Sequence, residues 1–192
     1  MTNDIEFYEQ SEGGLTLSGG EPLSQSNGLL ELLKKAKRNN LHICLDTTGY
    51  CDWVNFEKVL EYVDIILYDV KQIKDEEHKR LTGVSNHLIL ENLKLCLKQK
   101  VKIIVRIPVI LGQNFTDIES ELEEYIKNLI QIGVKKFELI PYHKFGEQKY
   151  EMLDREYIIS VKDINSNEIW KVINNLLEEY DVSIKVSRPI IS

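Results

Sequence analysis

Six short apolar runs, rich in β-branched residues, alternate with helix-like stretches along the chain. The runs are Leu15–Leu17, Leu41–Asp46, Val63–Asp69, Val101–Ile110, Val134–Ile140 and Val182–Val186. They are nearly all apolar, as expected for strands of a parallel sheet that are covered on both faces. Apolar residues at helical spacing predict helices over Gly28–Asn39, Ile118–Leu129 and Ile169–Tyr180. The alternation predicts an α/β fold with parallel strands and right-handed crossovers.

Composition limits the class of protein without assigning a function. The 192 residues are 43% hydrophobic and 29% charged, which suits one domain with a sizeable core. The net charge of −7 comes with no basic stripe, so neither nucleic acid nor a membrane is an expected partner. No apolar run approaches the length of a membrane span and no signal-peptide pattern opens the chain. With three cysteines and no sign of a disulfide framework, we expect a cytoplasmic protein.

The segment Ser18–Pro22, with the sequence Ser-Gly-Gly-Glu-Pro, directly follows the first apolar run. Two glycines there let the backbone approach a ligand closely, because no side chain stands in the way. Glu21 offers a carboxylate that suits a ligand ammonium, and Pro22 stiffens the chain before the helix. Taken alone, the segment fits an ordinary strand-to-helix turn equally well.

Polar residues recur where the later runs end. Asp46 closes the second run, Asp69 and Lys71 close the third, Arg106 lies within the fourth, and His143 follows the fifth. In parallel α/β folds the carboxyl ends of the strands assemble the functional site. The alternatives are a surface ion pair between Asp69 and Lys71 and a purely structural His143.

More than twenty residues between Pro141 and Ser166 show neither a helix nor a strand period. Loops of that length in a compact domain are usually functional or disordered. Three tyrosines and His143 argue against plain disorder, so we predict a functional loop over residues 142–165 that covers a ligand or faces a partner.

The order and spacing of these motifs resemble one known family, the radical S-adenosylmethionine (SAM) activating enzymes of glycyl radical enzymes. Pyruvate formate-lyase activating enzyme is its best-known member. The matching segments are Phe7–Ser11 with Gly13 and Gly14, Ser18–Pro22, Leu45–Gly49, Asp69–Ile73, Gly83–Asn86, Arg106–Pro108, Leu139–His143, and Lys149 and Tyr150 with Leu153 and Tyr157. The resemblance covers nearly the whole chain and implies a partial (β/α)6-type open barrel.

The resemblance also implies a SAM site. Glu21 and the backbone of Gly19 and Gly20 would meet the SAM ammonium, while Lys71 and His143 would donate to its carboxylate or ribose. The full set of implied cofactor-binding residues is Gly19, Gly20, Glu21, Asp46, Lys71, Arg106 and His143. Asp46 and Asp69 would repel each other if they were close, unless a cation lay between them. Family members have a monovalent cation there, which maps to Asp46, Thr47, the Leu67 carbonyl and Asp69.

One element of the family is missing from this sequence. In the family, a Cys-x3-Cys-x2-Cys loop holds a [4Fe-4S] cluster, whereas this chain has only Cys44, Cys51 and Cys96, far from that spacing. We expect Cys44 to be a small buried hydrophobe, Cys96 to lie on an apolar helix stripe and Cys51 to lie in a loop. The resemblance therefore predicts a single truncated radical SAM domain over residues 1–192. This domain would lack its first βα unit, and residues 1–14 would form a lead-in. No catalytic residue is expected in this chain, and alone it should not reduce SAM.

Two functions follow as expectations. In the first, the chain is part of an activase that reductively cleaves SAM to a 5′-deoxyadenosyl radical, which takes hydrogen from a glycine of a partner glycyl radical enzyme. A flavodoxin or ferredoxin would supply the electron to the cluster. In the second, the chain is a non-catalytic remnant that binds SAM or the partner. The intact set of site residues favours the first, and the motifs do not specify which glycyl radical enzyme is activated.

Overall fold

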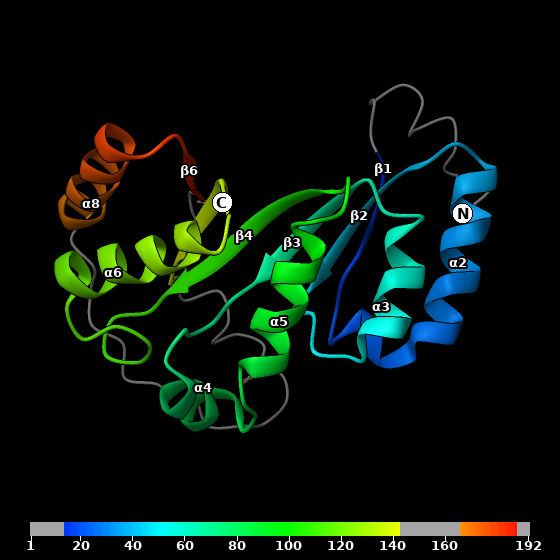
Figure 1. Ribbon diagram of the computed structural model, residues 1–192, viewed down its shortest axis with the longest axis horizontal. Coiled ribbons are helices and arrows are strands. Elements are labelled where there is room, and N and C mark those ends of the chain that lie inside the picture. Colours follow the sequence, from blue (N-terminus) through cyan, green and yellow to red (C-terminus); the bar gives the residue numbers. More distant parts are fainter. Residues whose placement is uncertain (1–13, 143–165, 188–192) are drawn as a thin grey trace, which may run out of the picture. The chain divides into compact units, whose positions relative to one another are not determined.

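The computed structural model describes residues 14–142 and 166–187 (Figure 1). The lead-in over residues 1–14, apart from Gly14, lies outside this part of the chain. The same holds for the predicted loop over residues 142–165, apart from Tyr142, and for the candidate residue His143.

Within the described residues, six strands form one sheet in the order β1-β2-β3-β4-β5-β6. Their bounds are β1 Gly14–Leu17, β2 His42–Thr47, β3 Ile65–Asp69, β4 Lys102–Val109, β5 Lys136–Pro141 and β6 Ser183–Val186. The pairs β1–β2, β2–β3 and β5–β6 are parallel. Each strand lies within two residues of a predicted run, so the predicted α/β class with an open parallel sheet is confirmed.

Helices follow the strands along the chain. They are the short 3-10 helix η2 Pro22–Gln25 and the α-helices α2 Ser26–Arg38, α3 Trp53–Leu60, α4 Asp75–Thr82, α5 His87–Cys96, α6 Ile118–Gln131 and α8 Ser166–Glu179. The three helices predicted by apolar periodicity correspond to α2, α6 and α8. In α6, the Asp117 carboxylate accepts the Ser120 amide at 2.8 Å and caps the first turn.

The described residues of the chain belong to two compact units. The first comprises residues up to Val70 together with Ser85–Val105, and the second comprises Lys71–Val84 and the residues from Arg106 onward. Strand β4 contributes its first half to one unit and its second half to the other. The single domain that we predicted from the sequence stays a prediction.

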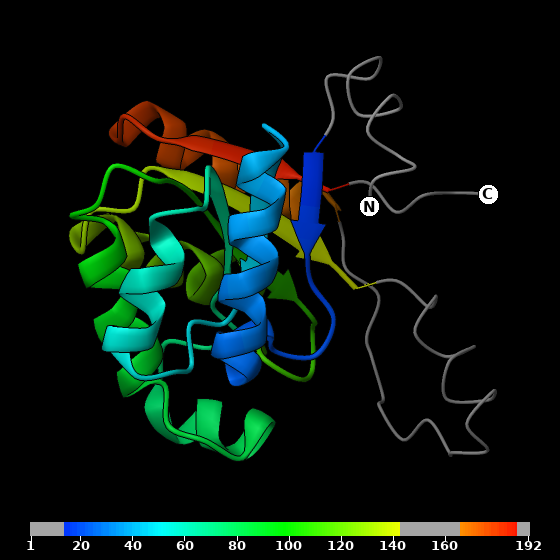
Figure 2. The same ribbon diagram turned by 90° about the vertical axis from the view of Figure 1, so that its right-hand side faces the viewer.

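In the first unit, α2 lies beside α3 and packs on β2, as Figure 2 shows with α2 in blue and α3 in cyan. Its core contains the fully buried Leu33, Ile43, Leu45, Phe56 and Ile66. The burial of β2 and β3 alternates between buried and half-buried residues. One face of each strand thus packs tightly among the described residues, and coverage of the second face stays a prediction.

In the second unit, α6 and α8 lie side by side (Figure 1). Strands β5 and β6 pair with Glu138 opposite Lys185 and Leu139 opposite Val186. The core of this unit includes Leu122, Ile126, Phe137, Leu139 and Leu176, each at most 2% exposed.

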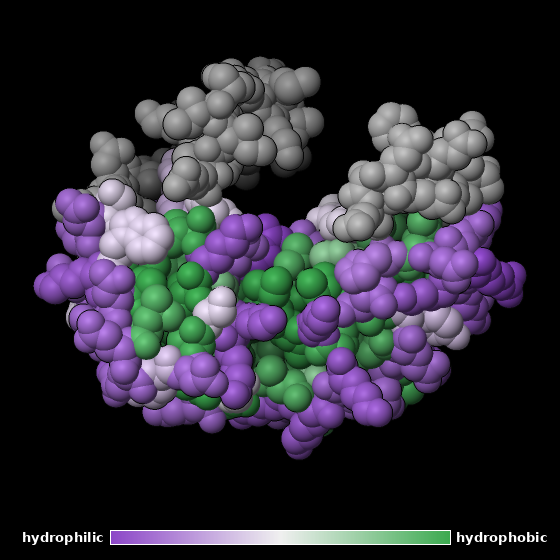
Figure 3. Space-filling model, turned by 90° about the horizontal axis from the view of Figure 1, so that it is seen from above, coloured by the Kyte–Doolittle hydropathy of each residue, from purple (hydrophilic) through white to green (hydrophobic). Residues whose placement is uncertain are grey.

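Hydrophilic and apolar side chains share the described surface. On the face shown in Figure 3, hydrophilic residues in purple surround apolar residues in green. Within residues 14–142 and 166–187, no helix has the length and apolar character needed to cross a membrane.

Candidate functional site

The turn after β1 is built on two glycines in the left-handed region. Gly19 has a φ of 90° and Gly20 a φ of 60°, conformations that other residues adopt only with strain. A Cβ at either position would meet nothing within 4 Å. The glycines are therefore needed for the backbone path, and the turn borders open space that a ligand can enter.

The Glu21 carboxylate joins this turn to the end of β2. Thr47 Oγ1 donates to Glu21 Oε1 at 2.5 Å. The Thr48 amide and Thr48 Oγ1 donate to Oε2 at 2.9 and 2.5 Å. The Leu23 amide donates to Oε1 at 3.2 Å, within the first turn of η2. Four donors therefore converge on one carboxylate.

Asp46 lies close to the same turn. Ser18 Oγ donates to Asp46 Oδ2 at 2.8 Å. The strand register places Asp46 opposite Leu67 and Thr47 opposite Tyr68. The candidate cation ligands Asp46, Thr47 and Leu67 are thus neighbours on two strands, and Asp69 ends the second of them.

No three His, Cys, Asp or Glu side chains form a metal-binding group in the part of the chain that the structure describes. The candidate cation set has a different composition, with two carboxylates, a threonine and a carbonyl. A monovalent cation at this set stays a prediction.

Residues of α5 and β3 hold the loop after β2 in place. Asn92, buried on α5, donates to the Gly49 carbonyl at 2.7 Å and to the Cys51 carbonyl at 2.8 Å. Gly49 has a φ of 70°, and a Cβ there would lie 1.9 Å from Tyr68 Oη. The Tyr68 hydroxyl donates to the Ile89 carbonyl at 2.7 Å, and burial raises the pKa of this phenol well above its ordinary value. The loop is therefore packed against a rigid support.

Sequence reasoning missed Asn92 and Tyr68 as supports of this loop. A signal for Asn92 was present, since a lone amide lies among Ile89, Leu93 and Cys96 on the buried stripe of α5. A buried amide in such a stripe has to find partners.

The cysteines do not form a cluster site. Cys44 lies on β2, Cys51 in the following loop and Cys96 on α5, and none of these three described cysteines forms a disulfide. Cys96 is buried as expected, but Cys44 is only half-buried because it lies on the less covered face of β2. Burial, reinforced by the carboxylates of Glu21 and Asp52, raises the pKa of Cys51 to about 12. Burial also raises the pKa of Cys96 to about 12. These cysteines therefore do not fit the [4Fe-4S] cluster, which needs thiolate ligands.

In the second unit, two buried amides brace the segment that contains Lys71. Gln72 and Asn114 are 6% and 7% exposed. Asn114 Nδ2 donates to the carbonyls of Pro108 at 2.5 Å and Lys71 at 3.3 Å, and Asn114 Oδ1 accepts the Ile110 amide at 2.8 Å. Gln72 Nε2 donates to the Asn114 carbonyl at 2.9 Å. The exposed Lys71 thus stands on backbone that is tied to the end of β4.

Arg106 lies on β4 and faces a carboxylate from β5. Its Nε is 3.5 Å from Glu138 Oε2, with side chains 23% and 17% exposed. Glu138 also accepts a hydrogen bond from Ser187. The ion pair offsets the cost of partly burying the guanidinium. Glu138 was not among the predicted residues.

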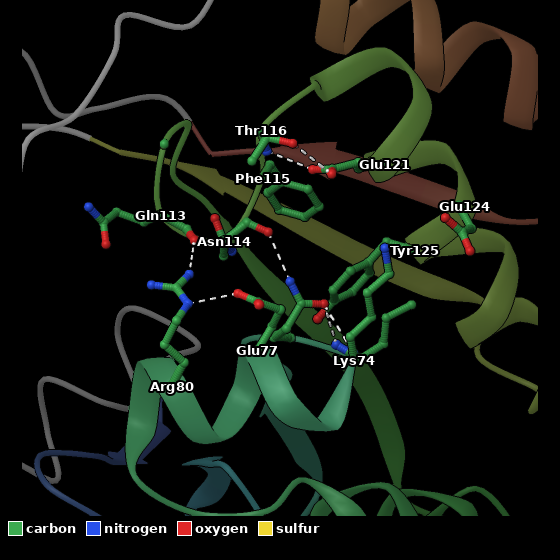
Figure 4. A pocket seen from close by; sticks show the side chains of 13 residues that line it. Lys74, Glu77, Arg80, Gln113, Asn114, Phe115, Thr116, Glu121, Glu124 and Tyr125 are labelled. Carbon is green, nitrogen blue, oxygen red and sulfur yellow. Dashed lines mark hydrogen bonds and ion pairs between the residues drawn. The ribbon is translucent and has the colours of Figure 1, made fainter.

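A hollow of about 510 Å³ lies between the segments that follow Val70 and Val109 (Figure 4). Arg80 donates to Glu77 Oε2 and to the Gln113 carbonyl, each at 2.8 Å. On the opposite wall, the Thr116 hydroxyl and amide donate to the two oxygens of Glu121 at 2.8 and 2.6 Å. The bond from Arg80 to the Gln113 carbonyl joins the two segments, whereas the other bonds stiffen each wall by itself.

The predicted site residues thus fall into two groups, each described within its own unit. The first unit holds Gly19, Gly20, Glu21, Asp46, Thr47, Leu67 and Asp69, and the second holds Lys71 and Arg106. Their roles toward SAM and toward a cation stay predictions.

Comparison with known proteins gives a family. A model of the radical SAM superfamily matches residues 4–138. The chain is 43% identical over 158 residues to the isethionate sulfite-lyase activating enzyme of Oleidesulfovibrio alaskensis, covering 81% of this chain and 50% of that protein. It is 35% identical over 187 residues to the trans-4-hydroxy-L-proline dehydratase activating enzyme of Clostridioides difficile, covering 97% of this chain and 62% of that protein.

The similarity extends to pyruvate formate-lyase 1-activating enzyme of Escherichia coli, at 33% identity over 91% of this chain and 71% of that protein. A crystal structure of a domain of pyruvate-formate lyase-activating enzyme from Bacteroides vulgatus superposes with a TM-score of 0.72. It is 24% identical and covers 92% of this chain and 99% of that one, which supports the fold. The chain spans about half the length of the first of these relatives.

Proposed function

The chain belongs to the radical SAM superfamily, and on that premise we propose that it is the SAM-binding part of an activating enzyme for a glycyl radical enzyme. The observation that carries the proposal is the open glycine turn after β1, fixed to the end of β2 through Glu21. The names of the relatives support the proposed partner class, since each is an activating enzyme for a lyase or dehydratase.

The chemistry of the predicted residues, taken unit by unit, supports SAM as the ligand. SAM carries an ammonium, a carboxylate, a sulfonium, a ribose and an adenine, so its site needs acceptors, donors and an apolar slot. The open turn at Gly19 and Gly20 offers backbone carbonyls, which suit the ammonium. Lys71 and Arg106 supply cations that suit the carboxylate or the ribose hydroxyls.

The proposed activity of the whole enzyme is reductive cleavage of SAM and hydrogen abstraction from a glycine of the partner, with a flavodoxin or ferredoxin as the reductant in the cytoplasm. We assign no electron-transfer step to the described residues, because their cysteines do not fit a cluster. Their part in the reaction is to bind and orient SAM and to exclude water from it.

A second candidate function is SAM or partner binding without catalysis. The observation that favours it is the placement of Cys44, Cys51 and Cys96 on three separate elements. Both candidates need a SAM site, so they differ only in whether the protein takes up iron and forms a radical.

Equilibrium dialysis with labelled SAM tests the site, with and without prior anaerobic treatment with iron and sulfide. We expect the wild-type chain to bind SAM and Gly20→Val to bind about tenfold more weakly, because valine is strained at a φ of 60°. Gly28→Ala is the control, since Gly28 borders open space and has no positive φ. Absence of SAM binding under both conditions would refute the proposed site.

Electron paramagnetic resonance of a glycyl radical enzyme incubated with SAM, a chemical reductant and the native protein isolated from its source cells separates the two candidates, because the cysteines of this chain alone do not fit a cluster. Iron uptake with a glycyl radical signal would support the activase. SAM binding without iron or radical would support the binding function.

A further inference from the structure

We propose that Tyr50 and Val54, called the rim pair below, form a docking surface for the partner protein. The part of the partner that docks there is the segment around its reacting glycine, which presses an apolar side chain against the pair. This inference rests on the proposed function, because it names the surface through which that function reaches a protein substrate.

The first step is the exposure of the rim pair. Within the described residues, four large apolar side chains are at least 44% exposed, and they are Tyr50, Val54, Trp170 and Leu177. Tyr50 and Val54 lie only four positions apart, whereas the other two lie on α8 in the second unit. Burial of apolar surface is favourable, so a protein that covers the rim pair gains binding free energy.

The second step is the place of the rim pair in the first unit. Tyr50 follows closely after Thr48, whose amide and hydroxyl bind the Glu21 carboxylate, and the Tyr50 amide donates to Thr48 Oγ1 at 3.3 Å. Val54 lies in the first turn of α3, which begins where the loop after β2 ends. The rim pair therefore borders the segment that we propose to bind SAM, within the same unit.

The third step is the identity of the occupant. The proposed substrate is a backbone glycine of another protein, so the glycine has to come within about 3–3.5 Å of the reacting atom of the ligand. A protein that approaches so closely covers the residues that border the site. The segment around the glycine is thus the part of the partner that reaches the rim pair, and apolar side chains of that segment match its chemistry.

The fourth step is the stiffness of the surface. Asn92 donates to the carbonyls of Gly49 and Cys51, on both sides of Tyr50 in the chain. At the start of α3, the Trp53 ring makes a T-shaped contact with the fully buried Phe56, with 6.0 Å between the centroids. Docking on backbone that is already ordered loses little conformational entropy. A tyrosine on such a support is a typical hot spot of an interface.

Substitutions at the rim pair have matched controls elsewhere in the chain. Tyr50→Ser and Val54→Ser remove the apolar groups, and Tyr50→Phe keeps the ring. Trp170→Ser and Leu177→Ser are the controls, since both side chains are exposed to a similar degree on α8. All five changes are at exposed positions, so circular dichroism should show that each variant folds.

The first experiment measures binding of the full chain to purified pyruvate formate-lyase and isethionate sulfite-lyase by biolayer interferometry, with S-adenosylhomocysteine present. We expect Tyr50→Ser and Val54→Ser each to weaken binding about tenfold, and Tyr50→Phe and the two α8 controls to stay within about twofold of wild type. Wild-type affinity in both Tyr50→Ser and Val54→Ser would overturn the docking surface.

The second experiment identifies the occupant. Tyr50→p-benzoylphenylalanine places a photoreactive group at the rim pair, and Trp170→p-benzoylphenylalanine is its control. After irradiation with the same two enzymes, peptide mass spectrometry should find the crosslink from position 50 in the partner peptide that contains the glycine, and no such crosslink from position 170. A crosslink from position 50 to a different part of the partner would overturn the proposed occupant.

Calorimetry with S-adenosylhomocysteine and no partner separates failure of this inference from failure of the proposed function. All variants should bind this probe as wild type does, because the rim pair contacts the partner and not the ligand. A wild-type chain that binds neither the probe nor a partner enzyme would refute the proposed function. A chain that binds the probe but neither enzyme would overturn the docking surface alone.

Discussion

Gly49 has a φ of 70°, and it lies so close to Tyr68 that no side chain fits at this position. A Cβ would lie 1.9 Å from Tyr68 Oη, and the Tyr68 ring is fully buried and held by its bond to the Ile89 carbonyl. Neither the backbone nor the tyrosine can shift without breaking a buried hydrogen bond. At the scale of single residues, this loop is therefore defined by sterics.

Gly49→Ala should destabilise the fold by about 2–4 kcal/mol, because the strain of a left-handed alanine adds to the clash with Tyr68. Urea unfolding followed by circular dichroism measures the change. Gly28→Ala, in α2, is the control and should be neutral or stabilising by up to about 1 kcal/mol, as alanine favours a helix. Equal stability of Gly49→Ala and wild type would contradict the close approach.

Cys51 and Cys96 should react slowly with alkylating agents. Their pKa values of about 12 lie above the ordinary 9.0, so the thiolate is about a thousandfold rarer at pH 8 than in an ordinary thiol. Iodoacetamide labelling followed by peptide mass spectrometry checks this, with the protein unfolded in urea as the reference. Rapid labelling of either cysteine in the folded chain would contradict the prediction.

The raised pKa values of Cys51 and Cys96 also make the stability of the folded state depend on pH. Each thiol has a higher pKa in the folded state than in the unfolded state, so its protonated form favours folding. This contribution is complete below pH 9 and is lost as the pH rises toward 12.

At the scale of elements, the strands could be predicted from the sequence because each is a continuous apolar run. Helix α4 could not, since its eight residues are mostly charged and only His78 is buried. Glu21 and Asp46 were identified because they end or follow strands. Their partners Thr48 and Ser18 belong to the same motifs. Glu138 and the bond of Asn114 to Lys71 were not predicted, because each joins residues more than thirty positions apart.

Asn114 connects the end of β4 to the segment that follows β3. Asn114→Ala should therefore destabilise the second unit by about 2–4 kcal/mol. The change leaves the Ile110 amide and the Pro108 carbonyl without this partner in a partly buried setting. Thermal unfolding measures the loss. Asn128→Ala, which removes one exposed bond to the Glu124 carbonyl, is the control and should cost under about 1 kcal/mol. A similar loss in both variants would argue against the brace.

At the scale of the whole molecule, each unit contains one of the two tryptophans, Trp53 in α3 and Trp170 in α8. Strand β4 runs through the boundary between the units, with Val105 on one side and Arg106 on the other. A shared strand couples their unfolding, because fraying one half exposes the backbone of the other.

We therefore expect Trp53→Phe and Trp170→Phe, each with one remaining tryptophan, to show the same urea midpoint by fluorescence. Circular dichroism of each variant is the control for the effect of the substitution itself. Two separate midpoints would mean that the units unfold independently and that the chain is not a single cooperative domain.

The path of the backbone between the units has one more consequence. The chain passes from one unit to the other at residues 70/71, 84/85 and 105/106, so the residues of each unit come from separate stretches of sequence. A protease that cuts the chain once cannot separate the two units, because a cut at any position leaves residues of both units in at least one fragment. The chain connects the two units three times. Neither unit can therefore be expressed by itself as one continuous segment, and a split for fragment complementation has to divide at least one unit.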